Sequence, residues 1–275
     1  MNYRHIYHAG NFADVVKHAI LLTLLDALKR KEKPFCVLDS HAGIGLYDLN
    51  STETQKKQEY QHGIARLFSS SNRSTPTIIM NYLEIIRHFN INDNLEFYPG
   101  SPLICASTLR TDDRLIACEL HEDDVKTLTK QMYPYEQAST HFMNGYHAMK
   151  AFLPPTEARG LVLIDPPFEK TSEFDDIIES LRLALKHWRG GVYAIWYPIK
   201  DKGIVNRFYS DLKALSFPTL TVEFSLKNME DVSNLISCGF VILNPPWKIQ
   251  ESLSSEILPY LANTLDASHT ITYEN

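Results

Sequence analysis

Hydrophobic residues gather in short runs typical of buried strands. Most runs are separated by segments in which apolar residues recur every three to four positions, as in amphipathic helices. The predicted strands cover residues 35–38, 115–119, 160–164, 191–197, 220–226 and 238–243. Predicted helices cover residues 123–132, 173–187 and 204–215. This alternation predicts an α/β fold with a doubly wound, mostly parallel sheet.

Two segments depart from simple alternation. Residues 52–94 contain helical patterns at 59–68 and 78–89, which predicts a small inserted helical subdomain at 51–94 within a main domain of residues 1–50 and 95–275. The last two predicted strands are joined by a polar loop without a helix, so they are expected to be antiparallel neighbours. A mostly parallel sheet that ends in an antiparallel hairpin is the plan of class I methyltransferases, which are Rossmann-like, whereas nicotinamide dehydrogenases continue with parallel units.

Composition bounds the class of protein. With 275 residues and 44% hydrophobic content, the chain can form a sizeable core. Its apolar stretches are too short for a membrane span and residues 1–10 lack a signal-peptide pattern, so a cytoplasmic protein is expected. The net charge of −6 argues against nonspecific coating of nucleic acid, although residues 4–33 contain a local group of lysines and arginines. The four scattered cysteines are interpreted as reduced core residues: Cys36, Cys105, Cys118 and Cys238.

The first predicted strand runs into a glycine-containing turn, Asp39-Ser40-His41-Ala42-Gly43-Ile44-Gly45. Glycines at this place let the backbone approach a nucleotide-like ligand closely. Asp48 stands where the dinucleotide fingerprint has its third glycine, which disfavours a pyrophosphate site. The turn suits S-adenosylmethionine (SAM), which has no phosphate; a plain strand-to-loop turn is the alternative.

Two later strand ends carry further candidate cofactor contacts. Glu119 ends a strand and can accept hydrogen bonds from ribose hydroxyls, although a surface carboxylate is the alternative. Asn144-Gly145 follows another candidate strand, where an amide or acid commonly meets the adenine amino group of the cofactor. A simple turn would also explain this pair.

The most specific local signal is Asp165-Pro166-Pro167-Phe168, which follows the predicted strand at 160–164. An amino group on a purine is a poor nucleophile because its lone pair is delocalised. The Asp165 carboxylate and the Pro166 carbonyl could accept its two hydrogens and localise the lone pair for attack on a methyl group. The two prolines stiffen the loop, and Phe168 offers a face for a base taken out of its stack.

A second motif of this type is Asn244-Pro245-Pro246-Trp247. Topology separates the two motifs, because ligands bind at the carboxyl ends of parallel strands. The strand before Asn244 is predicted to be antiparallel and to end at the opposite edge. We therefore expect a structural role for this motif.

The N-terminal segment is densely polar. Asn11, with Asp14 three residues on, predicts a helix that begins here and continues through Lys29. Lys17 and His18 then lie within its second turn, where a solvated helix face and a role in the site both remain open.

Motifs over nearly the whole chain, including this N-terminal segment, carry a family resemblance. They are Tyr3-Arg4-His5, His8-Ala9-Gly10-Asn11, Ala13-Asp14-Val15 with Lys17-His18, Asp39-x-His41-Ala42-Gly43-x-Gly45, Tyr98-Pro99-Gly100-Ser101-Pro102, Asp165-Pro166-Pro167, Trp196-Tyr197-Pro198 and Asn244-Pro245-Pro246-Trp247. Together they resemble the RlmJ family of bacterial 23S ribosomal RNA adenine-N6 methyltransferases.

The resemblance implies a monomer that uses SAM to methylate a flipped adenine, at position 2030, in naked or partly assembled 23S rRNA. It implies catalytic roles for Asp165, Pro166, Pro167, Phe168 and Lys17. Cofactor contacts are implied for His18, His41, Gly43, Ser101, Glu119, Asn144, Gly145 and Asp165. Tyr3, His5, Lys17 and Phe168 are implied to hold the target base. The sequence departs from the family twice, since Phe168 replaces a tyrosine and Asn144 replaces an aspartate.

Two alternatives remain open. One keeps the chemistry but changes the acceptor to DNA adenine or a protein glutamine, and the other is an RNA-binding assembly factor without turnover. Transfer of radiolabel from SAM to RNA, DNA or protein would distinguish them. No metal is expected, because the histidines lack HxxxH or HExxH spacing.

Overall fold

The computed structural model describes residues 4–70, 74–91, 94–227 and 235–275. Within these residues the main sheet has eight strands in the order β10-β8-β9-β7-β6-β1-β4-β5. The strands are β1 (Cys36–Asp39), β4 (Arg114–Glu119), β5 (Ala138–Phe142), β6 (Gly160–Ile164), β7 (Val192–Pro198), β8 (Thr219–Leu226), β9 (Ser237–Leu243) and β10 (Ala267–Glu274). All six strands predicted from the sequence are confirmed, to within one residue at each end.

The direction of the strands agrees with the prediction. Strands β5, β4, β1, β6 and β7 are parallel neighbours, whereas β9 runs antiparallel to both β7 and β8. The mostly parallel sheet with an antiparallel end, the class I methyltransferase plan, is therefore confirmed. Strand β10 was not predicted; it adds antiparallel to β8 at the sheet edge. Its sequence, ASHTITYE, is mostly polar because most of its residues are partly or fully exposed.

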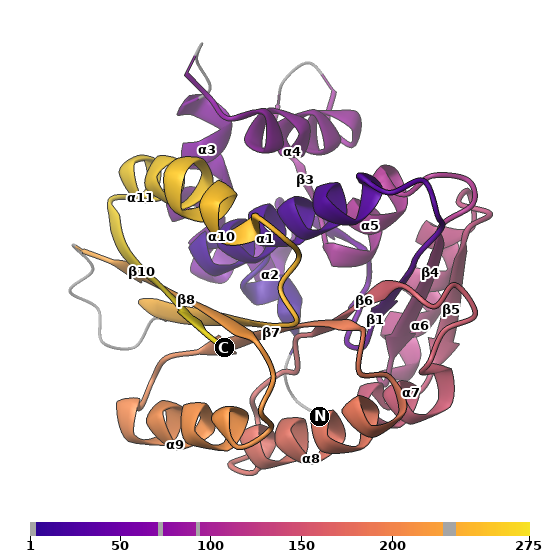
Figure 1. Cartoon of the computed structure of the whole chain (residues 1–275). Helices are drawn as coiled ribbons and strands as arrows, with labels where there is room; N and C mark the ends of the chain where they lie inside the picture. The colour runs from indigo at the N-terminus through magenta and orange to yellow at the C-terminus, as the bar shows by residue number, and fades with distance from the viewer. Residues whose placement is uncertain (1–3, 71–73, 92–93, 228–234) are drawn as a thin grey trace.

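Helices cover both faces of the sheet (Figure 1). One face packs against α1 (Phe12–Lys29), α5 (Ser101–Thr108), α6 (Glu122–Met132), α10 (Ile249–Ser252), the π-helical turn η3 (Leu253–Ile257) and α11 (Leu258–Leu265). The other face packs against α7 (Gly145–Phe152), α8 (Glu173–His187) and α9 (Lys202–Lys213). Strand residues alternate between the layers: Val37 faces the α1 side and Leu38 the α8 side.

Helix α1 begins as its sequence predicts. The Asn11 side chain caps it by accepting a hydrogen bond from the backbone nitrogen of Asp14 at 2.9 Å. A short 3₁₀ helix, η1 (His5–Tyr7), precedes it. The helix is buried along most of its length, including Lys17 and His18, which are 4% and 1% exposed. These two residues are therefore not part of a solvated face.

The segment between β1 and β4 holds α2 (Thr52–Lys57), η2 (Glu59–His62), α3 (Ile64–Ser70) and α4 (Thr77–His88). Two short strands, β2 (Leu46–Asp48) and β3 (Phe97–Pro99), pair antiparallel at its base. The prediction of a single helix over 59–68 is wrong, because the helix is interrupted at Gly63, between η2 and α3. A Cβ there would lie 2.2 Å from the Gly10 carbonyl oxygen, so the backbones pass too closely for a regular helix.

The paired strands β2 and β3 support our proposal that residues 51–94 are an insertion. The buried hydrophobic side chains of this insertion, among them Leu67, Tyr82 and Leu83, belong to the same hydrophobic cluster as those of α1. The insertion therefore shares the core of the main domain. The four cysteines are free and buried, as expected. In the described part of the chain, no helix is long and apolar enough to cross a membrane.

Candidate active site

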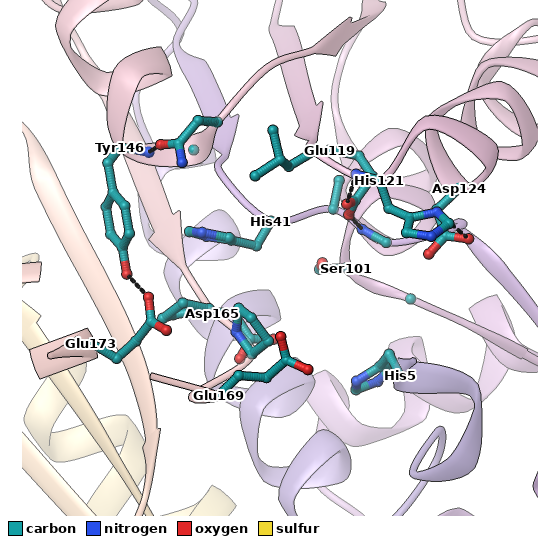
Figure 2. A pocket seen from close by; sticks show the side chains of 18 of the residues that line it. His5, His41, Ser101, Glu119, His121, Asp124, Tyr146, Asp165, Glu169 and Glu173 are labelled. Atoms are coloured by element: carbon teal, nitrogen blue, oxygen red, sulfur yellow. Dashed lines mark hydrogen bonds and ion pairs between the residues drawn. The ribbon is translucent and has the colours of Figure 1, made fainter. Parts of the chain in front are cut away.

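A cavity of about 360 Å³ opens at the carboxyl ends of β1, β4, β5 and β6 (Figure 2). A pocket of this size is ordinary for a small-molecule or cofactor site. Twelve of the residues singled out in the sequence line it: His5, Lys17, His18, His41, Gly43, Ser101, Glu119, Asn144, Gly145, Asp165, Pro166 and Pro167. Tyr3 lies outside the described residues. The fold therefore gathers into one site positions that are widely separated along the chain.

The glycine turn and Glu119 are joined directly. Gly43 has a φ of +63°, a conformation that favours glycine. Its backbone nitrogen donates to Glu119 Oε2 at 2.8 Å, and the His121 nitrogen donates to Oε1 at 2.8 Å. Burial raises the pKa of Glu119, and these two donors oppose the rise. Each carboxylate oxygen can accept further hydrogen bonds, so the side chain remains suited to a diol.

His41 is neutral and has a defined tautomer. The Ser40 hydroxyl donates to the Leu163 carbonyl oxygen at 2.8 Å, so its oxygen accepts from His41 Nδ1 at 2.8 Å. The Nε2 atom is then an acceptor. Burial lowers the pKa of His41 to about 4. The ring also meets Tyr146 edge-on, with centroids 5.3 Å apart.

Asn144 caps helix α7. Its Oδ1 accepts from the backbone nitrogens of Tyr146 and His147, at 2.9 and 3.2 Å. A carbonyl oxygen has two lone pairs, and this cap uses both. The side chain therefore has its amide NH₂ left as a donor for a ligand, in contrast to the acceptor expected from the sequence.

Asp165 lies at the end of a buried charged chain. Lys17 Nζ is 2.5 Å from Asp165 Oδ2 and 2.7 Å from Asp14 Oδ1. On the other side of Asp14, Oδ2 is 2.9 Å from His5 Nε2 and accepts from the Gly10 nitrogen at 3.0 Å. Burial lowers the pKa of Lys17, but the two carboxylates outweigh this and raise it well above its ordinary value. Lys17 is thus an ammonium that orients Asp165.

The rest of the Asp165-Pro166-Pro167-Phe168 loop divides between cavity and core. Both prolines line the cavity. Phe168, at a φ of +49°, is not among the lining residues. Its ring packs instead against Phe174 and Trp196, with centroids 5.1 and 5.9 Å away. A stacking role for Phe168 stays a prediction, and in this structure the ring supports the loop from behind.

The second motif lies elsewhere. Strand β9 pairs antiparallel with β7, so Asn244 follows Leu243 at the edge where β7 begins. Asn244 Nδ2 donates to the carbonyl oxygens of Arg189 and Gly191, both at 2.8 Å. These bonds tie loops together at the edge remote from Asp165, which agrees with the structural role predicted.

Several residues of the site had not been singled out from the sequence. The sequence predicts Asp14 only as part of a helix start and of a family motif, with no role in the site, and Glu173 only as the start of a helix. Glu173 is 4% exposed and accepts from the Tyr146 hydroxyl at 2.6 Å beside the cavity (Figure 2). The contacts of Asp14 with His5 and of Glu173 with Tyr146 join different elements, so local spacing does not mark them. Only the contact of Asp14 with Lys17 has a local spacing, of three residues within α1. Among the described residues, no group of three or more His, Cys, Asp or Glu is placed to hold a metal ion.

Comparison with known proteins places these features in a family. The family model described as "Ribosomal RNA large subunit methyltransferase D, RlmJ" matches residues 32–274. "Ribosomal RNA large subunit methyltransferase J" of Haemophilus influenzae is 39% identical over 267 residues, 96% of this chain and 94% of that protein. The Escherichia coli protein of the same name is 36% identical over 266 residues, with 96% and 94% covered. The crystal structure of Legionella pneumophila protein LPL1258 superposes with a TM-score of 0.89 at 33% identity, covering 96% of this chain and 98% of that one.

Proposed function

The chain belongs to the RlmJ family of ribosomal RNA large subunit methyltransferases, and from this premise we propose that it transfers a methyl group from SAM to an adenine of 23S rRNA. The acceptor is the exocyclic N6 amino group of a flipped adenine, at position 2030. The enzyme acts as a cytoplasmic monomer on naked or partly assembled RNA.

One observation carries the proposal. Asp165, at the end of β6, lines the same cavity as His41, Gly43 and Glu119, which follow or end β1 and β4. A methyl acceptor held at Asp165 is thereby placed next to a nucleoside held at Glu119. A rigid turn without a catalytic role would not require the buried ion pair between the Lys17 ammonium and the Asp165 carboxylate.

The polar groups of the cavity fit SAM. Glu119 offers a carboxylate to the ribose hydroxyls, and Asn144 with Gly145 lies where the adenine would bind. His18 Nε2 is buried and has no hydrogen-bond partner in the described part of the chain, which is the condition expected of an atom reserved for a ligand. When bound, SAM supplies an electrophilic methyl group on its sulfonium.

The chain's own residues prepare the nucleophile. Lys17 occupies Asp165 Oδ2, which leaves Oδ1 to accept one N6 hydrogen, while the Pro166 carbonyl accepts the other. Both bonds localise the nitrogen lone pair. As the bond between N6 and the methyl carbon formed, the carbon–sulfur bond would break and S-adenosylhomocysteine would leave. The preorganised Asp165 carboxylate would stabilise the positive charge that develops on N6, and N6 would then lose one proton to solvent. The N-terminal segment, through His5 and Lys17, lies over the base.

Label transfer from methyl-tritiated SAM tests the proposal. The purified chain should label 23S rRNA taken from a strain that lacks it, yielding N6-methyladenosine at position 2030, and should leave duplex DNA and protein unlabelled. The Asp165→Ala variant should lose at least about 100-fold in turnover, as expected for a group that acts in the transition state, with near-normal SAM binding. Label in DNA or protein would assign another acceptor. Full activity of Asp165→Ala would remove Asp165 from the mechanism.

A further inference from the structure

A buried hydrogen-bond chain links the insertion to the cavity. The Tyr82 hydroxyl on α4 is 2.7 Å from the Tyr98 hydroxyl on β3, which is 2.6 Å from His18 Nδ1 on α1. Tyr82 and Tyr98 are fully buried, and His18 is 1% exposed. Of the three, only His18 lines the cavity.

The direction of the hydrogen bonds follows from counting donors. Within the described part of the chain, the Tyr82 hydroxyl has Tyr98 as its one hydrogen-bond partner, so its proton is used only if it donates to Tyr98. Tyr98 then donates to His18 Nδ1, and both hydroxyl protons have an acceptor. The remaining proton is the one on His18 Nε2, in a residue that lines the cavity, where a ligand can supply the acceptor. In the opposite direction the Tyr82 proton would be buried without an acceptor, which is unfavourable. These hydrogen bonds therefore place the imidazole proton of His18 on Nε2.

We propose that Tyr82 and Tyr98 are positioning residues that fix His18 as an Nε2–H donor for the carboxylate of the methionine part of SAM. The inference rests on the proposed function for the identity of this ligand. The Nε2 atom is buried and unpartnered among the described residues, which suits a donor that meets an acceptor on a bound ligand.

Two neighbouring features favour an anion at this position. Gly100 and Ser101, at the N-terminus of α5, line the same cavity, and a helix N-terminus carries partial positive charge. Lys17 comes directly before His18 and is an ammonium. Burial and this charge lower the pKa of His18 well below its ordinary value, so the ring is neutral and carries one proton. A neutral donor beside two positive groups suits a carboxylate.

Calorimetry with two ligands tests the proposal. The first ligand is S-adenosylhomocysteine and the second is its decarboxylated analogue. Tyr98→Phe should weaken the first about tenfold, the range expected for a hydrogen bond to a charged group, and should change the second by less than about twofold. Tyr82→Phe, outside the cavity, should weaken the first about threefold, because Tyr98 loses the donor that orients it. Tyr133→Phe, on a residue that is 90% exposed, is the matched control.

Nitrogen-15 NMR of the His18 ring gives a readout that a merely structural role would not change. The wild-type ring should be the Nε2–H tautomer, and Tyr98→Phe should shift it towards a mixture. Equal losses for both ligands in Tyr98→Phe, or an Nδ1–H tautomer in the wild type, would overturn the inference. If the wild type bound neither ligand, the proposed function would fail. The His18 tautomer would still decide in which direction the hydrogen bonds from Tyr82 through Tyr98 to His18 run.

Discussion

Lys17 Nζ lies 2.5 Å from Asp165 Oδ2, although 148 positions separate the two residues. The lysine side chain is 5% exposed and the aspartate 13%. Asp14 contacts the same ammonium at 2.7 Å, so one positive charge lies between two carboxylates away from water. The geometry of the candidate catalytic carboxylate is therefore set by the N-terminal helix.

Replacing Lys17 should affect both stability and turnover. In Lys17→Met, Asp14 and Asp165 would face each other without the charge between them. Removing one partner of a buried ion pair costs about 3–5 kcal/mol, and we expect a loss in the free energy of unfolding of this size, measured by urea denaturation. Turnover of folded protein should fall at least about 100-fold. Lys126→Met, at a 60% exposed side chain, should change either quantity little, and wild-type turnover in Lys17→Met would contradict the role of Lys17.

Asp14 should make stability depend on pH. Burial raises the pKa of this carboxyl, but the charges of His5 and Lys17 outweigh it and hold the pKa well below its ordinary value of 3.8. The folded chain thus binds this proton only at lower pH than the unfolded chain does. Its stabilising contribution is present above about pH 4 and is lost as the pH falls below that value.

The Asp14→Asn variant tests this dependence. Its free energy of unfolding should vary less steeply than that of the wild type between about pH 5 and pH 2, as measured by urea titrations at several pH values. Asp26→Asn, which removes a charge from a 47% exposed side chain, is the control. Parallel wild-type and Asp14→Asn curves over this range would show that Asp14 is not ionised in the way the structure implies.

Much of the fold could be predicted because its signals are local. The run at β6 and the pattern of α8 coincide with the observed bounds, since apolar runs and helical periodicity report burial directly. The break at Gly63 could not be predicted, because it depends on the backbone of Gly10, which is distant in sequence. Strand β10 was missed because an exposed edge strand has no apolar run.

The site divides in the same way. Motifs marked the residues at strand ends, and topology brought them together. The partners that orient them could not be predicted, because the contacts of Lys17 with Asp165 and of His18 with Tyr98 join residues that are far apart in sequence. Asn144 shows this most clearly. Its chemistry as a ligand contact depends on which of its atoms the helix cap uses, and this requires the three-dimensional structure of the cap.

Replacing Asn144 by aspartate, the residue that the family resemblance implies at this position, should strengthen cofactor binding. An aspartate can cap α7 with one oxygen and offer the other to the amino group of the cofactor adenine, whereas Asn144 has only NH₂ to offer. The substituted carboxylate would also add negative charge at the helix N-terminus, which is favourable. We expect Asn144→Asp to bind S-adenosylhomocysteine several-fold more tightly in calorimetry. Asn144→Ala, which lacks the cap, should bind more weakly and be less stable by about 1 kcal/mol. Unchanged or weaker binding in Asn144→Asp would contradict this account of the cap.

Asn244 should matter for stability and not for turnover. Its Nδ2 donates to Arg189 and Gly191 from the edge of the sheet remote from Asp165, and its φ is +53°. Asn244→Ala loses both hydrogen bonds and strains the backbone, so we expect a loss of about 1–3 kcal/mol in the free energy of unfolding. Asn244→Gly loses the same bonds but tolerates the φ, so its loss should be smaller, and the difference between the variants isolates the strain. Turnover of both, measured well below their melting temperatures, should match the wild type; a large fall in turnover of folded Asn244→Gly would bring this second motif into the mechanism.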